Sequence, residues 1–199
     1  YVDVQPDELL AQRSSDVFTT QLRLGEDVLA AGLPTMSVNR DAWLQTSTLL
    51  TGGALLLRNL GLRTAVLLSN SQKTTANGIS VFADSTRLVE LKLSSSDRMT
   101  AALADTGLSA ALTRGSDEPT GGPYLVAQQI LAELKVLRSE IIKRDETMSG
   151  RGVILSTESG ALPTTALVNA LISSIAGQPD MNFVSLEDLL NTMTISIVD

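Results

Sequence analysis

The 199-residue sequence contains neither cysteine nor histidine. Without cysteine the chain has no disulfide and no thiolate nucleophile, and without histidine it has no Ser-His-Asp or Cys-His catalytic pair. The usual zinc sites also depend on these two residue types, so we expect no transition metal and no cofactor. Carboxylates, hydroxyls, amides, lysine and arginine are the groups left for chemistry.

Positive charge and long apolar runs are scarce as well. Fifteen lysines and arginines stand against 22 acidic residues, giving a net charge of −7. This balance argues against a nucleic-acid partner, which needs a basic surface to displace counterions from phosphates. No apolar run approaches the roughly 18 residues that span a bilayer, so we expect no membrane span in this segment.

The composition that is present suits an ordinary folded domain. Hydrophobic residues make up 43% of the chain and charged residues 19%, so its length allows one sizeable core. We therefore expect a single α/β domain over residues 1–199. The sequence opens at Tyr1 within a strand-like pattern, and we interpret it as part of a larger protein.

Helical patterns alternate with short apolar strands along the chain. The clearest unit covers residues 55–72, where an amphipathic helix ends at Gly61 and a buried strand leads into a polar loop. Strands are expected at residues 1–4, 35–38, 65–68, 153–155 and 182–184. Helices are expected at residues 15–32, 47–60, 97–105, 124–145, 163–177 and 186–190. This order predicts mainly parallel strands with outer helices. Residues 194–198 read either as an edge strand or as the start of a following domain. The total of about six strands is too few for a closed eight-stranded barrel, so we expect an incomplete or degenerate (β/α) barrel.

Functional side chains of such folds lie at the carboxyl ends of the strands. By this rule the candidate catalytic carboxylates are Asp3, Asp41 and Glu158. The candidate ligand-binding residues are Asn39, Arg40, Trp43, Ser69 and Asn70. The alternative role for the carboxylates is to cap the following helices, and we expect capping for at least two of the three. Trp43 has two readings, stacking on a sugar ring or covering the core.

Several motifs in a fixed order resemble a large uncharacterised family of actinobacterial envelope proteins. They are Tyr1-Val2-Asp3, residues 60–69, residues 127–134 and residues 184–190. The resemblance implies a secreted, membrane-anchored parent on the extracytoplasmic face of the envelope. It also implies a domain similar to the barrels of glycoside hydrolases and polysaccharide deacetylases. This chain departs from the family at Asn39-Arg40-Asp41, where a Trp-Pro and an acidic residue are usual, and it lacks the metal-binding histidines of the deacetylases.

The favoured function is therefore a non-catalytic envelope domain that binds a cell-wall glycan or an envelope protein through loops at the strand ends. The alternative is a glycan hydrolase acting on cell-wall polysaccharide, which needs two carboxylates roughly 5–10 Å apart and no histidine. A nucleotide-binding domain is a third possibility, but the loop at residues 69–78 lacks the GxxxxGK[ST] pattern.

Overall fold

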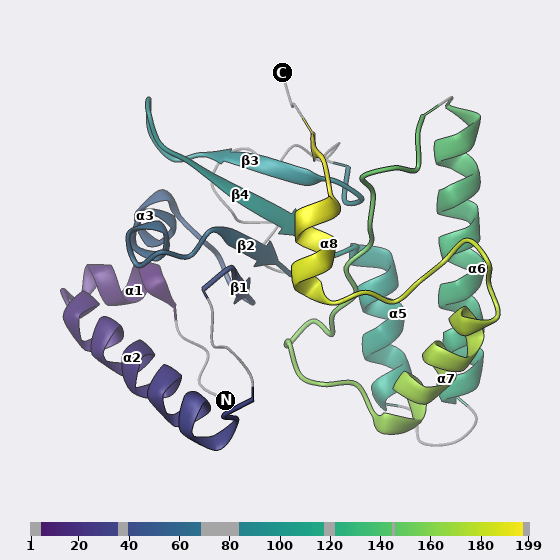
Figure 1. Ribbon diagram of the computed structural model, residues 1–199, viewed down its shortest axis with the longest axis horizontal. Helices are drawn as coiled ribbons and strands as arrows, with labels where there is room; N and C mark the ends of the chain where they lie inside the picture. Colours follow the sequence, from purple (N-terminus) through teal and green to yellow (C-terminus); the bar gives the residue numbers. More distant parts are fainter. Residues whose placement is uncertain (1–4, 36–39, 69–83, 118–121, 145, 197–199) are drawn as a thin grey trace.

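A computed structural model describes residues 5–35, 40–68, 84–117, 122–144 and 146–196 (Figure 1). Its centre is a five-stranded sheet in the order β1-β2-β4-β3-β5. The strands are β1 (Ala42–Gln45), β2 (Thr64–Leu67), β3 (Leu88–Lys92), β4 (Arg98–Leu103) and β5 (Ile195–Ser196). β1, β2 and β4 run parallel, β3 is antiparallel to β4, and β5 is parallel to β3. The mostly parallel α/β sheet expected from the sequence is confirmed.

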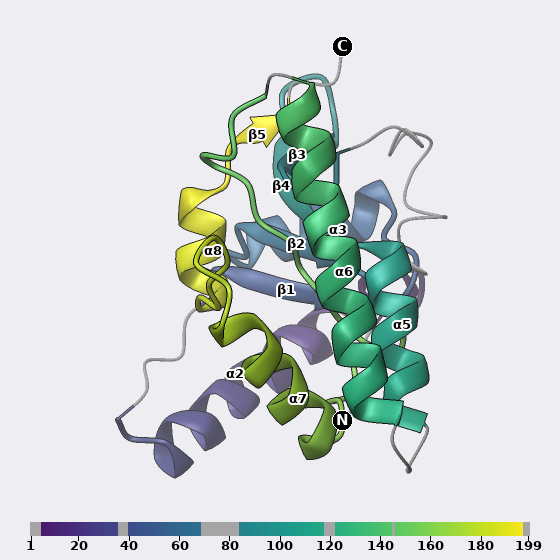
Figure 2. The ribbon, with the colours of Figure 1, turned by 90° about the vertical axis from the view of Figure 1, so that its right-hand side faces the viewer.

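Helices cover both faces of this sheet. On one side lie α1 (Pro6–Ala11), α2 (Ser15–Gly32) and α3 (Thr51–Asn59), which share a core with the sheet, and on the other lies the short α8 (Leu186–Thr192). A separate layer stands beyond the carboxyl ends of the parallel strands, made of α5 (Thr106–Asp117), α6 (Gly122–Lys143) and α7 (Thr165–Ala176) (Figure 2). The sheet edge expected to carry function therefore faces helices.

The buried strand β2 explains why two cores form. All four of its residues are buried, and successive side chains of a strand point to opposite faces. Ala65 and Leu67 pack into the cluster shared with α1 and α3, whereas Val66 and Leu68 pack against Ile154 and the α8 side. A strand apolar on both faces needs cover on both, which the helices provide.

Several helix starts are fixed by side chains that accept hydrogen bonds from free backbone N–H groups. Ser185 caps α8 through the amide of Asp188, at 3.1 Å. The start of α3 is capped from another helix, because Asp7 of α1 accepts bonds of 2.7 Å from the amides of Leu50 and Gly53. This contact ties α1 to α3.

Two sequence predictions of secondary structure are wrong. The helix expected at residues 97–105 is the strand β4, because pairing with β2 and β3 outweighs the weak helix preference of an alanine-rich segment. The strand expected at residues 182–184 is irregular, and Phe183 and Val184 are exposed with no strand beside them. The strand expected at 153–155 is reduced to one parallel bridge between Ile154 and Ala104.

Other predictions hold or fall outside the described residues. α2, α6, α7 and α8 and the strand β2 lie where they were expected, with ends shifted by a few residues. The second helix begins at Thr51 rather than at residue 47. Residues 1–4 and 36–39, which contain the first two expected strands almost entirely, are outside the described residues. Over the described part of the chain, no helix combines the length and apolar character needed to cross a membrane.

Candidate functional site

The carboxyl edge of the parallel strands receives residues from three segments. β4 ends at Leu103 and is followed by Asp105, which caps α5 by accepting a 2.9 Å bond from the amide of Leu108. Because β3 runs in the opposite direction, its first residues lie at this same edge, and Ser85 donates a 3.2 Å bond to Asp105. The segment after α6 joins them through Ile154, whose carbonyl accepts from the Asp105 amide at 2.9 Å.

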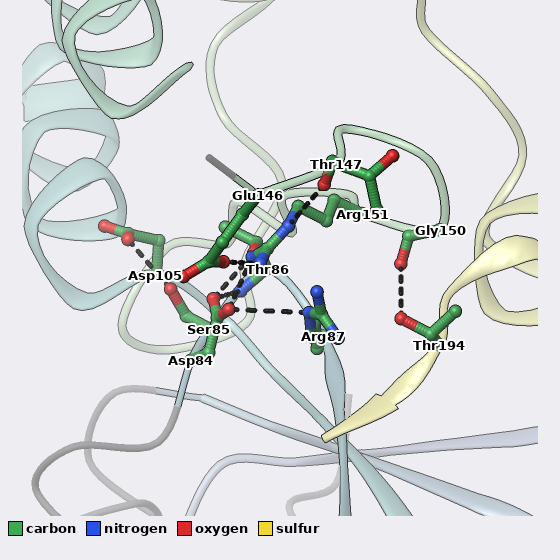
Figure 3. A network of polar contacts seen from close by, with 10 residues as sticks. All are labelled: Asp84, Ser85, Thr86, Arg87, Asp105, Glu146, Thr147, Gly150, Arg151 and Thr194. Atoms are coloured by element: carbon green, nitrogen blue, oxygen red, sulfur yellow. Dashed lines mark hydrogen bonds and ion pairs between the residues drawn. The ribbon is translucent and has the colours of Figure 1, made fainter. Parts of the chain in front are cut away.

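Arg151 is the centre of the polar network at this edge (Figure 3). Its side chain is only 3% exposed, and its guanidinium forms ion pairs with Asp84 and Glu146. Nη1 also donates to Thr86 Oγ1 at 2.6 Å, and Nε donates to the carbonyl of Thr147 at 3.0 Å. We call Asp84, Thr86, Glu146, Thr147 and Arg151 the Arg151 cluster. It joins the start of β3 to the connection between α6 and α7.

Asp84 of this cluster is held in the ionised form. Partial burial acts to raise the pKa of Asp84, but hydrogen bonds from the hydroxyl and amide of Thr86 and from Arg151 outweigh it, so the pKa lies below its ordinary value. A general acid of a glycosidase needs a raised pKa. Asp84 is therefore suited to holding two segments together through Arg151 and not to donating a proton.

A cavity of about 230 Å³ opens beside the Arg151 cluster, between α6, α7 and the chain at residues 148–155 and 180–183. We call it the α6–α7 cavity. Its apolar lining includes Leu134, Leu137, Ile141, Val153, Leu155 and Ile175. Ile141 and Ile175 are buried and form the floor, whereas Phe183 is 56% exposed and stands at the rim. Arg138 and Asp180, which also line it, form an exposed ion pair of 3.1 Å.

Arg40 and Asp41 do not lie at the edge where the sequence analysis placed them. The strand β1 follows Arg40 and Asp41 instead of preceding them, so both residues stand at its amino end. Arg40 donates to both carboxylate oxygens of Glu26, at 2.6 and 2.7 Å, and to the carbonyl of Leu60 at 2.5 Å. The error arose because a strand was expected at residues 35–38, which put the polar residues at its end.

Glu158 does lie near the carboxyl edge. Two residues later, Gly160 approaches Thr46, Leu44 and Leu68 beyond the ends of β1 and β2. The Glu158 side chain is exposed, and its backbone amide donates to Thr113 at 3.1 Å. Asp41 and Glu158 are thus at opposite ends of β1. Neither caps a helix among the described residues, so the capping prediction is wrong for both, and the capping is done by other side chains.

Trp43 is part of β1 and covers the core. Its ring packs edge-to-face on Phe18, with centroids 5.8 Å apart and planes at 87°. Its indole N–H donates to Gln45 Oε1 at 2.8 Å. Of the two roles considered for Trp43, the structure therefore favours covering the core. The indole ring packs on another aromatic ring, and the indole N–H already has an acceptor. The other candidates, Asp3, Asn39, Ser69 and Asn70, lie outside the described residues.

Sequence reasoning missed Asp84, Asp105 and Arg151. Asp105 was assigned to the end of a helix that does not exist, although an acidic residue just before a helical pattern is an N-cap signal. Arg151 stands between Gly150 and Gly152, directly before an apolar run. That placement was a usable signal, because glycines permit close approach of other segments.

The described residues contain no group of three or more His, Cys, Asp or Glu side chains placed to hold a metal ion. What they bring together at the carboxyl edge is a buried arginine, its paired carboxylates and an apolar cavity. No protein-family model matches the chain, and no match was found among curated proteins or among solved structures.

Proposed function

We propose that this chain is a non-catalytic binding domain of a cell-envelope protein, displayed on the extracytoplasmic face and built on a degenerate (β/α) barrel. The ordered sequence motifs support the envelope assignment, and the mostly parallel sheet with surrounding helices supports the architecture. Of the two ligand classes considered, we propose a protein partner. The observation that carries this choice is the α6–α7 cavity.

The size and lining of the cavity favour a protein side chain. About 230 Å³ is below the roughly 300–1,000 Å³ of sites that enclose small molecules. It suits one bulky apolar anchor, and such anchors in well-packed pockets dominate the energy of many protein interfaces. The rim adds an exposed aromatic ring, Phe183, and the exposed pair of Arg138 and Asp180, which matches an apolar centre with a polar border.

A glycan fits the same surface less well. Sugars are held by exposed aromatic faces together with many hydrogen-bonding groups, whereas Trp43 is occupied in the core and the cavity lining is mostly apolar. The non-catalytic reading is supported by the carboxylates at this edge. Asp84 and Glu146 are both paired with Arg151, and Asp105 is bonded to the start of α5.

The experiment is capture of envelope proteins on the immobilised chain, followed by calorimetry with each purified partner. Phe183→Ala removes a rim ring without disturbing a buried contact, and Tyr124→Ala removes an exposed ring far along α6 as its matched control. We expect the first variant to weaken binding by about tenfold, the effect of a moderate hot spot, and the second to leave it unchanged.

Three results would contradict the proposal. Binding of a soluble cell-wall glycan that is weakened by Phe183→Ala would change the ligand class. Hydrolysis of such a glycan that is lost in folded Asp84→Asn and Glu146→Gln variants would show an enzyme. Equal partner binding by the wild type, Phe183→Ala and Tyr124→Ala would exclude the cavity as the site.

A further inference from the structure

A second hollow lies at the opposite edge of the sheet, beside the amino ends of β2 and β4. Its volume is about 400 Å³, and its lining contains three arginines, Arg58, Arg63 and Arg98, and no acidic residue. Leu62, Met99 and Thr100 complete much of the wall. In a chain of net charge −7, three arginines around one hollow are an exception to the general charge. We call this hollow the arginine cleft.

The backbone brings these arginines together from three elements. Arg58 is in the last turn of α3, Arg63 immediately precedes β2, and Arg98 opens β4. The turn between α3 and β2 is made by Gly61, which has a φ of +89°, a conformation that glycine adopts without strain. The parallel register that pairs Thr64 with Thr100 then brings Arg63, one residue before β2, beside the amino end of β4, where Arg98 lies.

Two of the arginines are held in place by acidic residues outside the cleft. Arg58 Nη1 is paired with Asp97, and Arg98 Nε is paired with Glu90 at 3.1 Å. Arg98 Nη1 also donates to the carbonyls of Ser94 and Asp97, at 3.1 and 3.2 Å. These bonds leave Nη2 of both side chains without a partner in the part of the chain that the structure describes. Both are therefore positioned but still have donors to offer.

Arg63 has the largest number of free side-chain donors of the three arginines, counted against the described residues. Its side chain is exposed and has neither a hydrogen bond nor an ion pair with any described residue. Its backbone amide bonds to the carbonyl of Arg40 at 3.3 Å, which fixes the start of its side chain. Arg40 itself is neutralised by both oxygens of Glu26. Among Arg40, Arg58, Arg63 and Arg98, which all lie at this edge, Arg63 is thus the one that has no ion pair with a described residue.

We propose that the arginine cleft binds a phosphate-bearing ligand with at least two neighbouring anionic groups. Arginine presents a planar fork of donors that matches phosphate oxygens. Arg63 offers a whole fork, and Arg58 and Arg98 add one Nη2 group each, so the donors are spread over more than one phosphate. The volume of about 400 Å³ has room for a diphosphate group. This site is independent of the protein partner proposed above, since it lies at the other edge of the sheet.

The test is titration of the intact chain with pyrophosphate at low ionic strength, followed by calorimetry and ³¹P NMR. Arg63→Glu is the decisive variant, because the exposed side chain makes no hydrogen bond or ion pair with a described residue whose loss would destabilise the fold. We expect it to weaken pyrophosphate binding by at least about tenfold, the effect of losing a charge-assisted bond and adding a like charge. Arg114→Glu, an exposed reversal on α5, makes the same change in net charge and should leave the affinity within about twofold.

A second ligand distinguishes a preference for phosphate from a general affinity for anions. Citrate, a carboxylate oligoanion, is titrated in parallel, and we expect weaker binding than that of pyrophosphate, again reduced by Arg63→Glu. Equal binding of citrate would overturn the preference for phosphate. Absence of pyrophosphate binding, or equal loss in Arg63→Glu and Arg114→Glu, would overturn the site itself. Circular dichroism of both variants is the control for folding. None of these outcomes bears on the protein partner proposed for the α6–α7 cavity.

Discussion

Replacing Arg151 with methionine tests whether the Arg151 cluster holds the carboxyl edge together. Methionine keeps much of the length of the side chain but removes its charge and all its donors. Asp84 and Glu146 then lose their shared cation, and the carbonyl of Thr147 and the hydroxyl of Thr86 each lose a donor. We expect the folded state to be destabilised with no change in the order of the strands.

The size of the effect follows from the burial of the partners. Hydrogen bonds to charged groups contribute about 1.5–3 kcal/mol each, and breaking a fully buried pair costs about 3–5 kcal/mol. The side chains of Asp84 and Glu146 are 34% and 39% exposed, so hydrogen bonds from water replace part of the stabilisation that the arginine provided. We therefore expect a loss of about 2–4 kcal/mol in the free energy of unfolding. For a chain of this size that corresponds to a fall of roughly 5–15 °C in Tm.

Urea unfolding followed by circular dichroism measures this difference. Arg138→Met is the control, because its ion pair with Asp180 is 37% and 56% exposed and should contribute less than about 1 kcal/mol. The pH dependence gives a second test. The pKa of Asp84 is lowered in the folded state, so its contribution is present at neutral pH and is lost as acid titrates the folded carboxylate. Wild-type stability should therefore fall more steeply below about pH 5 than that of Arg151→Met. Equal stability of Arg151→Met and Arg138→Met would refute the reasoning.

Three further predictions concern other contacts. Gly152→Ala places a methyl group against Leu189 and should destabilise the chain by about 1–3 kcal/mol, whereas Gly177→Ala meets nothing and should be nearly neutral in the same urea assay. Asp7→Ala removes the cap of α3 and should cost about 1–2 kcal/mol in that assay, with the exposed Asp16→Ala as control; equal midpoints would contradict the cap. We also expect elemental analysis of protein purified without chelator to find no stoichiometric transition metal, because neither cysteine nor histidine is present.

Elements with strong local signals were predictable from the sequence. The helix α6 carries apolar residues at helical spacing over more than five turns, and β2 is an apolar run closed by Gly61 before it and polar residues after it. Thr164 and Ser185 precede α7 and α8 with the side chains that such starts prefer. In each case the local preference and the tertiary environment agree, so no long-range information was needed.

β4 shows where local signals fail. Met99, Ala101, Ala102 and Leu103 are all buried, but alanine, methionine and leucine favour a helix in isolation. The segment is a strand because β2 and β3 provide hydrogen-bonding partners on both sides. Those partners are distant or reversed in the chain, so only the assembled sheet shows the outcome. Because a helix was expected to end at Asp105, the role of this residue as the cap of α5 was not predicted.

The position of the candidate site follows from the single reversal within the sheet. In a wholly parallel sheet only carboxyl ends meet at the edge that carries function. Here β3 is antiparallel to β4, so the residues before β3, Asp84 to Thr86, arrive at that edge from the amino end of a strand. They bring a carboxylate and a hydroxyl to Arg151, and the close approach of Gly150 and Gly152 to Thr194 and Leu189 seats the arginine against them. A rule that examines only residues after strands cannot find this cluster. The same reversal puts the β3–β4 turn, with Asp97, at the amino edge. There Asp97 holds Arg58 and Arg98 beside Arg63, which has no ion pair with a described residue.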